Sequence, residues 1–141
     1  MDASKAVVRG FFEALDRREA ARLVPRFFTP GCRLHVAESA RVLVGHDAVR
    51  EHLQRQLDMY SAIRTELVDV VAESDRVAVW LTQHVTHRAD WASRVGLVAA
   101  VGRSVMIQAS ALARLEQGRI AEAWVQRDEL GMLLQLRHVH V

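Results

Sequence analysis

The sequence predicts an α+β domain in which a curved, mostly antiparallel sheet wraps around N-terminal helices. Apolar residues recur at helical spacing only in about the first 60 residues, whereas from Glu66 onward they alternate in β-branched segments separated by short turns. Helices followed by a long meander are typical of an α+β architecture. A chain of 141 residues has the size of one domain. We therefore expect a single cone-shaped domain over residues 1–141, with a mouth and an interior.

Three helices are predicted in the first part of the chain. Residues 4–16 form an amphipathic helix whose apolar residues recur at helical spacing: Ala6, Val8, Phe11, Phe12 and Leu15. A short helix over about residues 18–24 is expected to end before Pro25, which lacks a backbone donor. A turn at residues 29–31 and a strand over residues 32–37 follow. The third helix runs from about His46 to Met59, with these residues inward: Val49, Leu53, Leu57 and Tyr60.

Four strands and a final helix are predicted in the second part. Their segments are rich in β-branched and apolar residues and are bounded by turns such as residues 73–75 and 116–118. The strands span residues 67–72, 76–87, 103–115 and 119–128, and a helix over residues 129–136 follows.

Composition and charge exclude several classes of protein. The net charge is only +2 and the basic residues are scattered among acids, so the sequence lacks the basic stripe of nucleic-acid-binding proteins. The longest uninterrupted apolar run, residues 95–101, is far shorter than the roughly 20 residues that span a membrane. Cys32 is the single cysteine, and no other metal ligands cluster. We expect a cytoplasmic protein that binds neither nucleic acid nor membrane and needs no metal or cofactor.

Three stretches carry a recognisable pattern: Val8 to Leu15, Asp75 to Val79, and Gly118 to Leu136. The last is the most specific, with Glu122 and Trp124 followed by Asp128-x-Leu130-Gly131-Met132-Leu133-x-Gln135-Leu136. Together they resemble the SnoaL-like polyketide cyclase family of the nuclear transport factor 2-like superfamily. The resemblance implies an α+β cone with a deep pocket, commonly dimeric, that performs cofactor-free acid/base chemistry or binds a ligand. Because this superfamily carries many unrelated activities, the fold alone does not define a reaction.

Asp128 is the first candidate for catalysis. On a strand with a period of two it shares a face with Ile120, Glu122, Trp124 and Gln126, so its carboxyl would stand in a partly apolar wall. A carboxyl in such a wall can take and return a proton. The resemblance implies the same role, because the aspartate at this motif position is the proposed acid/base residue of the SnoaL-like cyclases. The alternative is that Asp128 caps the helix that follows, and the two roles are compatible.

His84 is the second candidate. Alternation along residues 76–87 places His84 and His87 on opposite faces, so the two histidines make a poor metal pair. In the similar limonene-epoxide-hydrolase branch, an arginine and an aspartate on this strand act with the terminal aspartate. The matching positions here look like His84 and Thr86, so that Asp-Arg-Asp arrangement is missing. A histidine beside Asp128 is still a credible proton-transfer pair, and the alternative is a structural, hydrogen-bonded histidine.

The remaining candidates line the predicted pocket. The strand over residues 103–115 has one purely apolar side and one mixed side, and we expect the mixed side, with Gln108 and Ser110, to face the pocket. Alternatively it faces a partner subunit, and one β-bulge would exchange the two sides. The resemblance adds His35 and His87, which match histidines that often occur in the family. The predicted substrate-binding set is Phe12, His35, Trp80, His87, Gln108, Ser110, Trp124 and Gln126.

The segment over residues 88–102 departs most from the family. It carries Trp91 and the apolar run of residues 95–101, and exposed apolar surface of this kind usually marks an interface or a lid. The segment therefore either covers the pocket mouth or packs against a second subunit, and we expect a homodimer or a higher homo-oligomer. His138 and His140, in the C-terminal tail, are expected at the surface or at an interface.

These observations predict a cofactor-free cyclase of natural-product biosynthesis. Asp128 would remove a proton from a hydrophobic, polyketide-like molecule, and His84 or Gln108 would donate to the developing oxyanion. The alternatives are another isomerase or cyclase, epoxide opening included, and a non-catalytic small-molecule-binding module. Several convergent titratable groups in the interior would favour an enzyme, whereas a purely apolar wall would favour binding alone.

Overall fold

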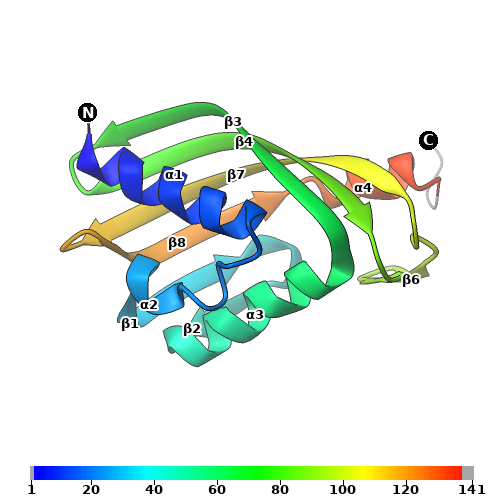
Figure 1. Ribbon diagram of the computed structural model, residues 1–141, viewed down its shortest axis with the longest axis horizontal. Helices are drawn as coiled ribbons and strands as arrows, with labels where there is room; N and C mark the ends of the chain where they lie inside the picture. The colour runs from blue at the N-terminus through cyan, green and yellow to red at the C-terminus, as the bar shows by residue number, and fades with distance from the viewer. Residues whose placement is uncertain (1, 138–141) are drawn as a thin grey trace.

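The computed structural model describes residues 2–137, so His138 and His140 lie outside the described residues. Its helices are α1 (Ala3–Asp16), α2 (Val24–Phe27), α3 (Gly45–Met59), α4 (Glu129–Gln135) and the short 3-10 helix η1 (Ala37–Ser39). Its strands are β1 (Phe28–Val36), β2 (Arg41–Val44), β3 (Tyr60–Glu73), β4 (Arg76–His87), β5 (Trp91–Ser93), β6 (Gly96–Val98), β7 (Ser104–Glu116) and β8 (Arg119–Arg127). Figure 1 shows the main sheet curving around α1 and α3.

The main sheet has six strands in the order β2-β1-β8-β7-β4-β3, and β5 pairs with β6 in a separate hairpin. All pairs in the main sheet are antiparallel except β1 with β8, which run parallel in a register that places Leu34 beside Ala123. The sheet curves without closing. The predicted α+β fold, a curved and mostly antiparallel sheet around N-terminal helices, is confirmed.

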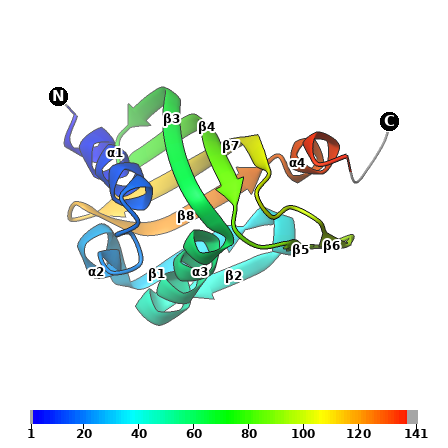
Figure 2. The same cartoon turned by 45° about the vertical axis from the view of Figure 1, so that its right-hand side comes forward.

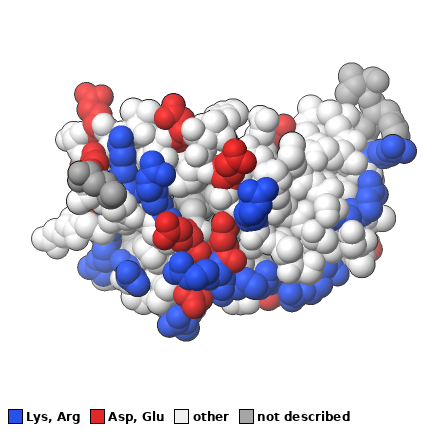
Figure 3. All heavy atoms as spheres, turned by 45° about the horizontal axis from the view of Figure 1, so that its top comes forward, with Lys and Arg blue, Asp and Glu red and all other residues white. Residues whose placement is uncertain are grey.

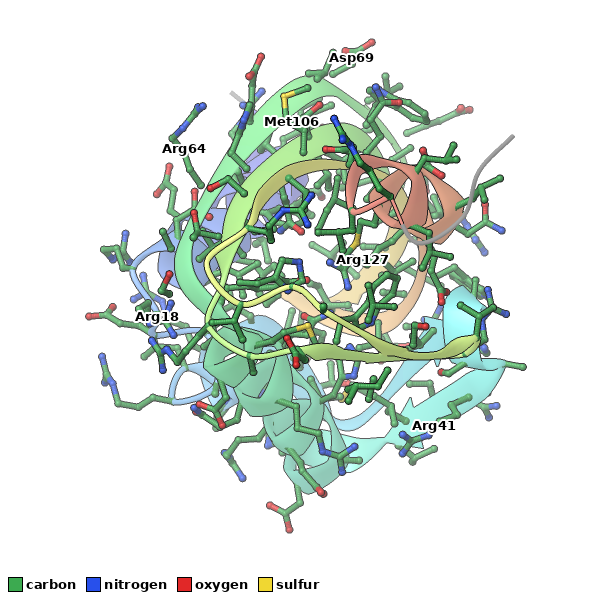
Figure 4. The ribbon with its side chains drawn as sticks, turned by 90° about the vertical axis from the view of Figure 1, so that its right-hand side faces the viewer. Arg18, Arg41, Arg64, Asp69, Met106 and Arg127 are labelled. Carbon is green, nitrogen blue, oxygen red and sulfur yellow. The ribbon has the colours of Figure 1, made fainter. Side chains whose placement is uncertain are left out.

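The two faces of the sheet differ sharply in polarity. Along β4, Val77, Val79 and Leu81 are buried, while Ala78 and Trp80 between them are exposed. The buried row faces the concave side, where it packs with α1, α3 and the inward rows of the other strands. Figure 4 looks into this concave side: Arg127 lies inside the curve, whereas Asp69 and Met106 lie on its outer rim.

Several predicted boundaries are corrected. The helix predicted over residues 18–24 is absent; residues 20–23 form turns, and Pro25 lies in the first turn of α2, where a missing backbone donor costs nothing. The turn predicted at residues 29–31 is an irregularity within β1. Strand β3 begins directly after α3 instead of at residue 67. The sequence prediction also missed the short elements β2, η1, β5 and β6, which carry too few residues for a periodic pattern.

Among the described residues, no helix combines the length and apolar character needed to cross a membrane. Figure 3 shows acidic and basic side chains next to one another in the middle of the face that it draws, and several basic side chains along its lower edge.

The tight turn between β7 and β8 depends on a glycine. Gln117 and Gly118 both have positive φ angles, 50° and 78°. Two such residues are typical of a type I′ turn, whose twist matches that of a two-stranded hairpin. A Cβ atom at Gly118 would meet no atom within 4 Å. A side chain there would therefore act only through the backbone conformation.

We expect Gly118→Ala to lower the free energy of unfolding by about 1–2 kcal/mol, the usual cost of placing an L side chain in the left-handed region. Urea denaturation of both proteins measures this difference. Gly31→Ala is the matched control, since Gly31 has equally open surroundings and no positive φ. Equal stability of the two variants would contradict the assignment of this turn.

Candidate active site

The concave face of the sheet, together with α1 and α3, encloses a cavity of about 100 Å³. Most of its wall is apolar, including Phe11 and Phe12 from α1. The space exists because β7 contributes only small side chains at the centre of the sheet: Ala109, Ala111 and Ala113. The polar side chains among the described wall residues are His52, Gln56, Gln83 and Arg127.

Helix α3 presents two polar groups to this cavity. Val49, Leu53 and Leu57 form its buried stripe. His52 and Gln56 lie one residue before Leu53 and Leu57, so they flank the stripe and reach the cavity wall. This spacing was visible in the sequence as polar positions bordering an apolar helical face.

A β-bulge decides which side chains of β8 face inward. Arg114 pairs with Glu122 and Leu115 with Ile120, which leaves Ala121 without a partner. Ile120 lines the cavity, and after the bulge the inward residues are Ala123, Val125 and Arg127. The predicted common face of Ile120 with Glu122, Trp124 and Gln126 is therefore wrong, because one extra residue exchanges the two sides.

Burial and the charge of Arg127 shift the pKa values of histidines in and beside the cavity. Arg127 donates a hydrogen bond of 2.8 Å to the hydroxyl of Tyr60, a side chain that is almost fully buried. Burial, and then the positive charge of Arg127, lowers the pKa of His52 to about 4. The same two causes, in the same order, lower the pKa of His87, while the backbone of Ala89 acts weakly in the opposite direction. His52 is consequently a neutral imidazole at pH 7, held close to a cation.

A second depression adjoins the cavity at its mouth. It has a volume of about 160 Å³ and shares Arg127 with the cavity. Its other walls come from Ser39 of η1, from the β5–β6 hairpin, including Trp91, and from α4. Figure 2 shows the hairpin and α4 at the same end of the molecule. Arg94 and Glu129 join the hairpin to α4 by an ion pair of 3.0 Å. The segment over residues 88–102 thus lies at the mouth, with Val95 and Leu97 exposed.

Most of the predicted substrate-binding residues lie on the convex face of the sheet instead. A groove of about 690 Å³ on that face is lined by His35, Trp80, Ser110, Trp124 and Gln126. The ring of His35 stacks on Trp124 with centroids 5.1 Å apart and donates to Glu122 across 2.7 Å, which holds the pKa of that carboxyl below its usual range. Gln108 is exposed on the same face.

The two predicted catalytic residues are not brought together. His84 lies on the convex face, 3.7 Å from the carboxylate of Glu66. Asp128 is exposed beyond the end of β8, and its Oδ1 accepts a 2.8 Å hydrogen bond from the Gly131 N–H, so the helix-capping alternative is confirmed. A Cβ on Gly131 would lie 2.3 Å from Asp128 Oδ2, which explains a glycine at this motif position. Neither His84 nor Asp128 belongs to the described wall of the cavity. Their catalytic roles stay predictions.

Two predicted residues lie at the interior. Phe12 lines the cavity. His87 is buried beside the cavity mouth, edge-on to the ring of Tyr60 at 5.1 Å. Cys32 is also buried, and burial raises the pKa of its thiol, which favours the unreactive protonated form.

The lowered pKa of His52 predicts a dependence of stability on pH. Between its ordinary value of 6.5 and about 4, the unfolded chain binds a proton at this histidine and the folded chain does not. The free energy of unfolding should therefore fall as the pH is lowered through this window, by up to about 3 kcal/mol from His52. In His52→Gln the fall should be smaller, with the remainder due to His87 and the carboxyl groups. Chemical denaturation at pH 7, 6, 5 and 4 measures it.

Gln56→Leu is the control for this experiment, because it also removes a polar side chain of the cavity wall but no titratable group. It should keep the wild-type dependence. A wild-type slope in His52→Gln would show that His52 titrates alike in the folded and unfolded chains.

Comparisons with known proteins agree with this architecture. TsrD from Streptomyces laurentii superposes with a TM-score of 0.82 at 20% identity, covering 99% of each chain. A SnoaL-like polyketide cyclase from Agrobacterium tumefaciens superposes with a TM-score of 0.80 at 18% identity, covering 96% of this chain and 99% of the other. An NTF2-like protein from Burkholderia pseudomallei gives 0.76 at 21%, covering 96% and 98%. At these identities the likeness concerns the fold.

No curated protein matches the sequence at a significant level. The sequence does match a family description, that of the SnoaL-like polyketide cyclases, over residues 6–136. This range includes α1 from residue 6 onward, the cavity wall and the Asp128 motif. The chain belongs to the SnoaL-like polyketide cyclase family.

Proposed function

We propose that the protein is a cofactor-free cyclase or isomerase that removes a proton beside a carbonyl group of a hydrophobic, polyketide-like molecule bound in the cavity. The observation that carries the proposal is the neutral imidazole of His52 close to the Arg127 cation within a largely apolar wall. Membership of the SnoaL-like family supports a small-molecule substrate and a cyclase or isomerase role.

The proposed reaction assigns one role to each group. The guanidinium of Arg127, oriented by Tyr60, receives the carbonyl oxygen of the substrate. His52 then takes a proton from the neighbouring carbon, and the electron pair of the broken C–H bond forms an enolate. For ring closure, the enolate carbon attacks a second carbonyl group of the same molecule. The electron pair of that C=O bond moves to its oxygen, which recovers the proton from the imidazolium.

The positive charges of Arg127 and of protonated His52 are compatible only while a negative charge develops on the substrate. In the empty cavity the charge of Arg127 opposes protonation of His52. A developing enolate offsets that charge, so the imidazolium becomes favourable when the negative charge appears beside it. In an apolar cavity such interactions are stronger than in water. The arrangement therefore stabilises the transition state more than the bound substrate, which is the requirement for catalysis.

The size of the cavity constrains how a substrate binds. About 100 Å³ is smaller than the roughly 300–1,000 Å³ of sites that enclose a drug-sized ligand. A substrate of several rings would extend past Arg127 into the mouth depression between the β5–β6 hairpin and α4. In that position its carbonyl group would lie beside Arg127, at the junction of the two spaces.

The side chains of the cavity wall also discriminate between proton removal, epoxide opening and ligand binding without catalysis. A non-catalytic binding module would be favoured by a purely apolar wall, whereas this wall includes an imidazole and a guanidinium. Epoxide opening by carboxylate-activated water finds no Asp or Glu among the described wall residues. Proton removal by a neutral base is the chemistry that the wall supports best.

The first test follows exchange of the α-protons of 2-tetralone, a hydrophobic bicyclic ketone, in deuterated buffer by NMR. The protein should accelerate exchange over buffer alone, with EDTA present and without added cofactor. His52→Gln should reduce the acceleration by about 10²- to 10⁴-fold, because it removes the base. Arg127→Gln should reduce it by about 10²- to 10³-fold, because it removes the charge that stabilises the enolate. Saturable binding of 2-tetralone without exchange would instead support the binding module.

Asp128→Asn separates the two candidate bases. The change keeps much of the capping ability, so the melting temperature should stay close to wild type, whereas Asp128→Ala should lose about 1 kcal/mol of stability with the cap. If His52 is the base, exchange by Asp128→Asn stays near the wild-type rate. A fall of about 10²- to 10⁴-fold would return the acid/base role to Asp128 and overturn the assignment to His52.

We also propose a homodimer that buries the convex face of the sheet, where Val42, Val71 and Trp80 are exposed around the groove. Light scattering at micromolar concentration should give twice the 15.9 kDa mass of one chain. Trp80→Asp should shift the mass to that of one chain, because it places a charge in an apolar interface. Leu97→Asp, on the exposed hairpin, is the matched control. Dissociation by Leu97→Asp alone would place the interface at the hairpin.

A further inference from the structure

We infer that Gln83 is a specificity-determining residue, which holds its carbonyl oxygen Oε1 toward the cavity as a fixed hydrogen-bond acceptor, so that the preferred ligand carries a hydroxyl group at that point. The inference deepens the proposed function in that it takes the same cavity as the ligand site. It concerns binding and does not depend on the identity of the base.

Gln83 is part of a chain of hydrogen bonds that begins outside the cavity. Asp16, the last residue of α1, accepts the backbone N–H of Thr65 on Oδ2 and the hydroxyl of Thr65 on Oδ1, both at 2.7 Å. The amide nitrogen Nε2 of Gln83 donates to Thr65 Oγ1 at 3.3 Å. The side chain of Gln83, only 8% exposed, also lines the cavity.

The direction of each bond in this chain follows from the carboxylate. An ionised carboxylate has no proton to donate, so Thr65 must direct its single hydroxyl proton to Asp16. The hydroxyl oxygen then has only lone pairs left for Gln83. The amide of Gln83 must therefore turn its NH₂ group toward Thr65, which leaves Oε1 as the amide atom available to the cavity.

The apolar surroundings of Gln83 make its carbonyl oxygen selective for ligands that donate a hydrogen bond. Along the inward row of β4, which ends at His87, the neighbours of Gln83 on both sides are apolar: Val77, Val79, Leu81 and Val85. A carbonyl oxygen in such surroundings is unfavourable when it makes no hydrogen bond. A ligand that brings an O–H group satisfies it, whereas an apolar group of the same shape leaves it unsatisfied. The discrimination is consequently between a donor and a hydrocarbon at the same position.

The positions of Gln83 and Arg127 determine where on the ligand each polar group must lie. Gln83 pairs with Ile107, and Arg127 pairs with Ala109, so β7 lies between the two polar residues. Two strand spacings separate their backbones by roughly 10 Å across the sheet. The fitting ligand is an apolar molecule with a carbonyl group at the Arg127 end and a hydroxyl group at the Gln83 end.

The test uses phenol and toluene, which differ by a hydroxyl in place of a methyl group. Affinities of the full chain for each probe are measured by NMR titration, and the quantity compared is the ratio of phenol to toluene affinity. Gln83→Leu should lower this ratio by about three- to tenfold, the usual worth of one hydrogen bond. Gln54→Leu is the matched control, since Gln54 is exposed and bonds to Asp58 outside the cavity. It should leave the ratio unchanged.

Three further variants test the direction of the chain while Gln83 stays in place. Thr65→Val should lower the ratio, because Gln83 loses the partner that orients it, and Thr65→Ser should restore it. In Asp16→Asn the introduced amide donates to Thr65, which then donates to Gln83 and turns its NH₂ group toward the cavity. This variant should bind benzonitrile, which only accepts, about three- to tenfold better relative to toluene than the wild type does. If Asp16 were merely structural, Asp16→Asn would lower the stability of the protein without improving benzonitrile binding relative to toluene.

An unchanged phenol-to-toluene ratio in Gln83→Leu, or no saturable phenol binding by the wild type, would overturn the inference. If Gln83→Leu fails to fold by circular dichroism, the ratios of Thr65→Val and Asp16→Asn decide alone, and unchanged ratios there overturn it. The outcome is independent of proton exchange. Phenol selectivity without 2-tetralone exchange would support this inference and contradict the proposed catalysis.

Discussion

The hollow interior of this protein depends on the small side chains that β7 turns toward the concave face. Protein interiors are packed as densely as organic crystals, so a curved sheet around two helices would normally be filled. The strand beside it, β4, does fill its part with Val77, Val79 and Leu81. At the centre of the sheet the alanines of β7 stop short of the aromatic rings of α1, and space is left between them. Larger residues there would remove the cavity without disturbing the fold pattern.

Two of the polar groups around this space are held from outside it. Arg127 is oriented by Tyr60, and Gln83 by Thr65 and Asp16. Arg127 and Gln83 thus each have one end fixed by a partner on another element, which limits their freedom before any ligand arrives. Preorganisation of this kind is what gives buried polar groups their effect on binding and on transition states. The residues behind the cavity wall therefore contribute to the geometry that a ligand meets, although they do not contact it.

The fold was largely predictable from the sequence, and the site was not. The alternation along residues 76–87 assigns Trp80 and His84 to one face correctly, because a strand without a bulge keeps its period. The alternation could not reveal which face is concave. The mixed side of β7 was expected to face the interior pocket, whereas its apolar side lines the cavity and its mixed side lines the convex groove. The bulge at Ala121 depends on the pairing with β7, and no pattern within β8 announces it. His52 was recoverable, since it borders the apolar stripe of α3, and Gln83 was visible as a polar break in an apolar row.

The parallel pairing of β1 with β8 has a consequence for how the chain is made. Leu34 is synthesised long before its neighbour Ala123, an interval on the order of ten seconds at ordinary rates of translation. Strand β2 follows β1 at once and covers one of its edges. The other edge keeps its backbone groups open until β8 has been synthesised. During that interval the open edge of β1 is a template for pairing with strands of other chains, so synthesis of β8 also ends a period of exposure to aggregation.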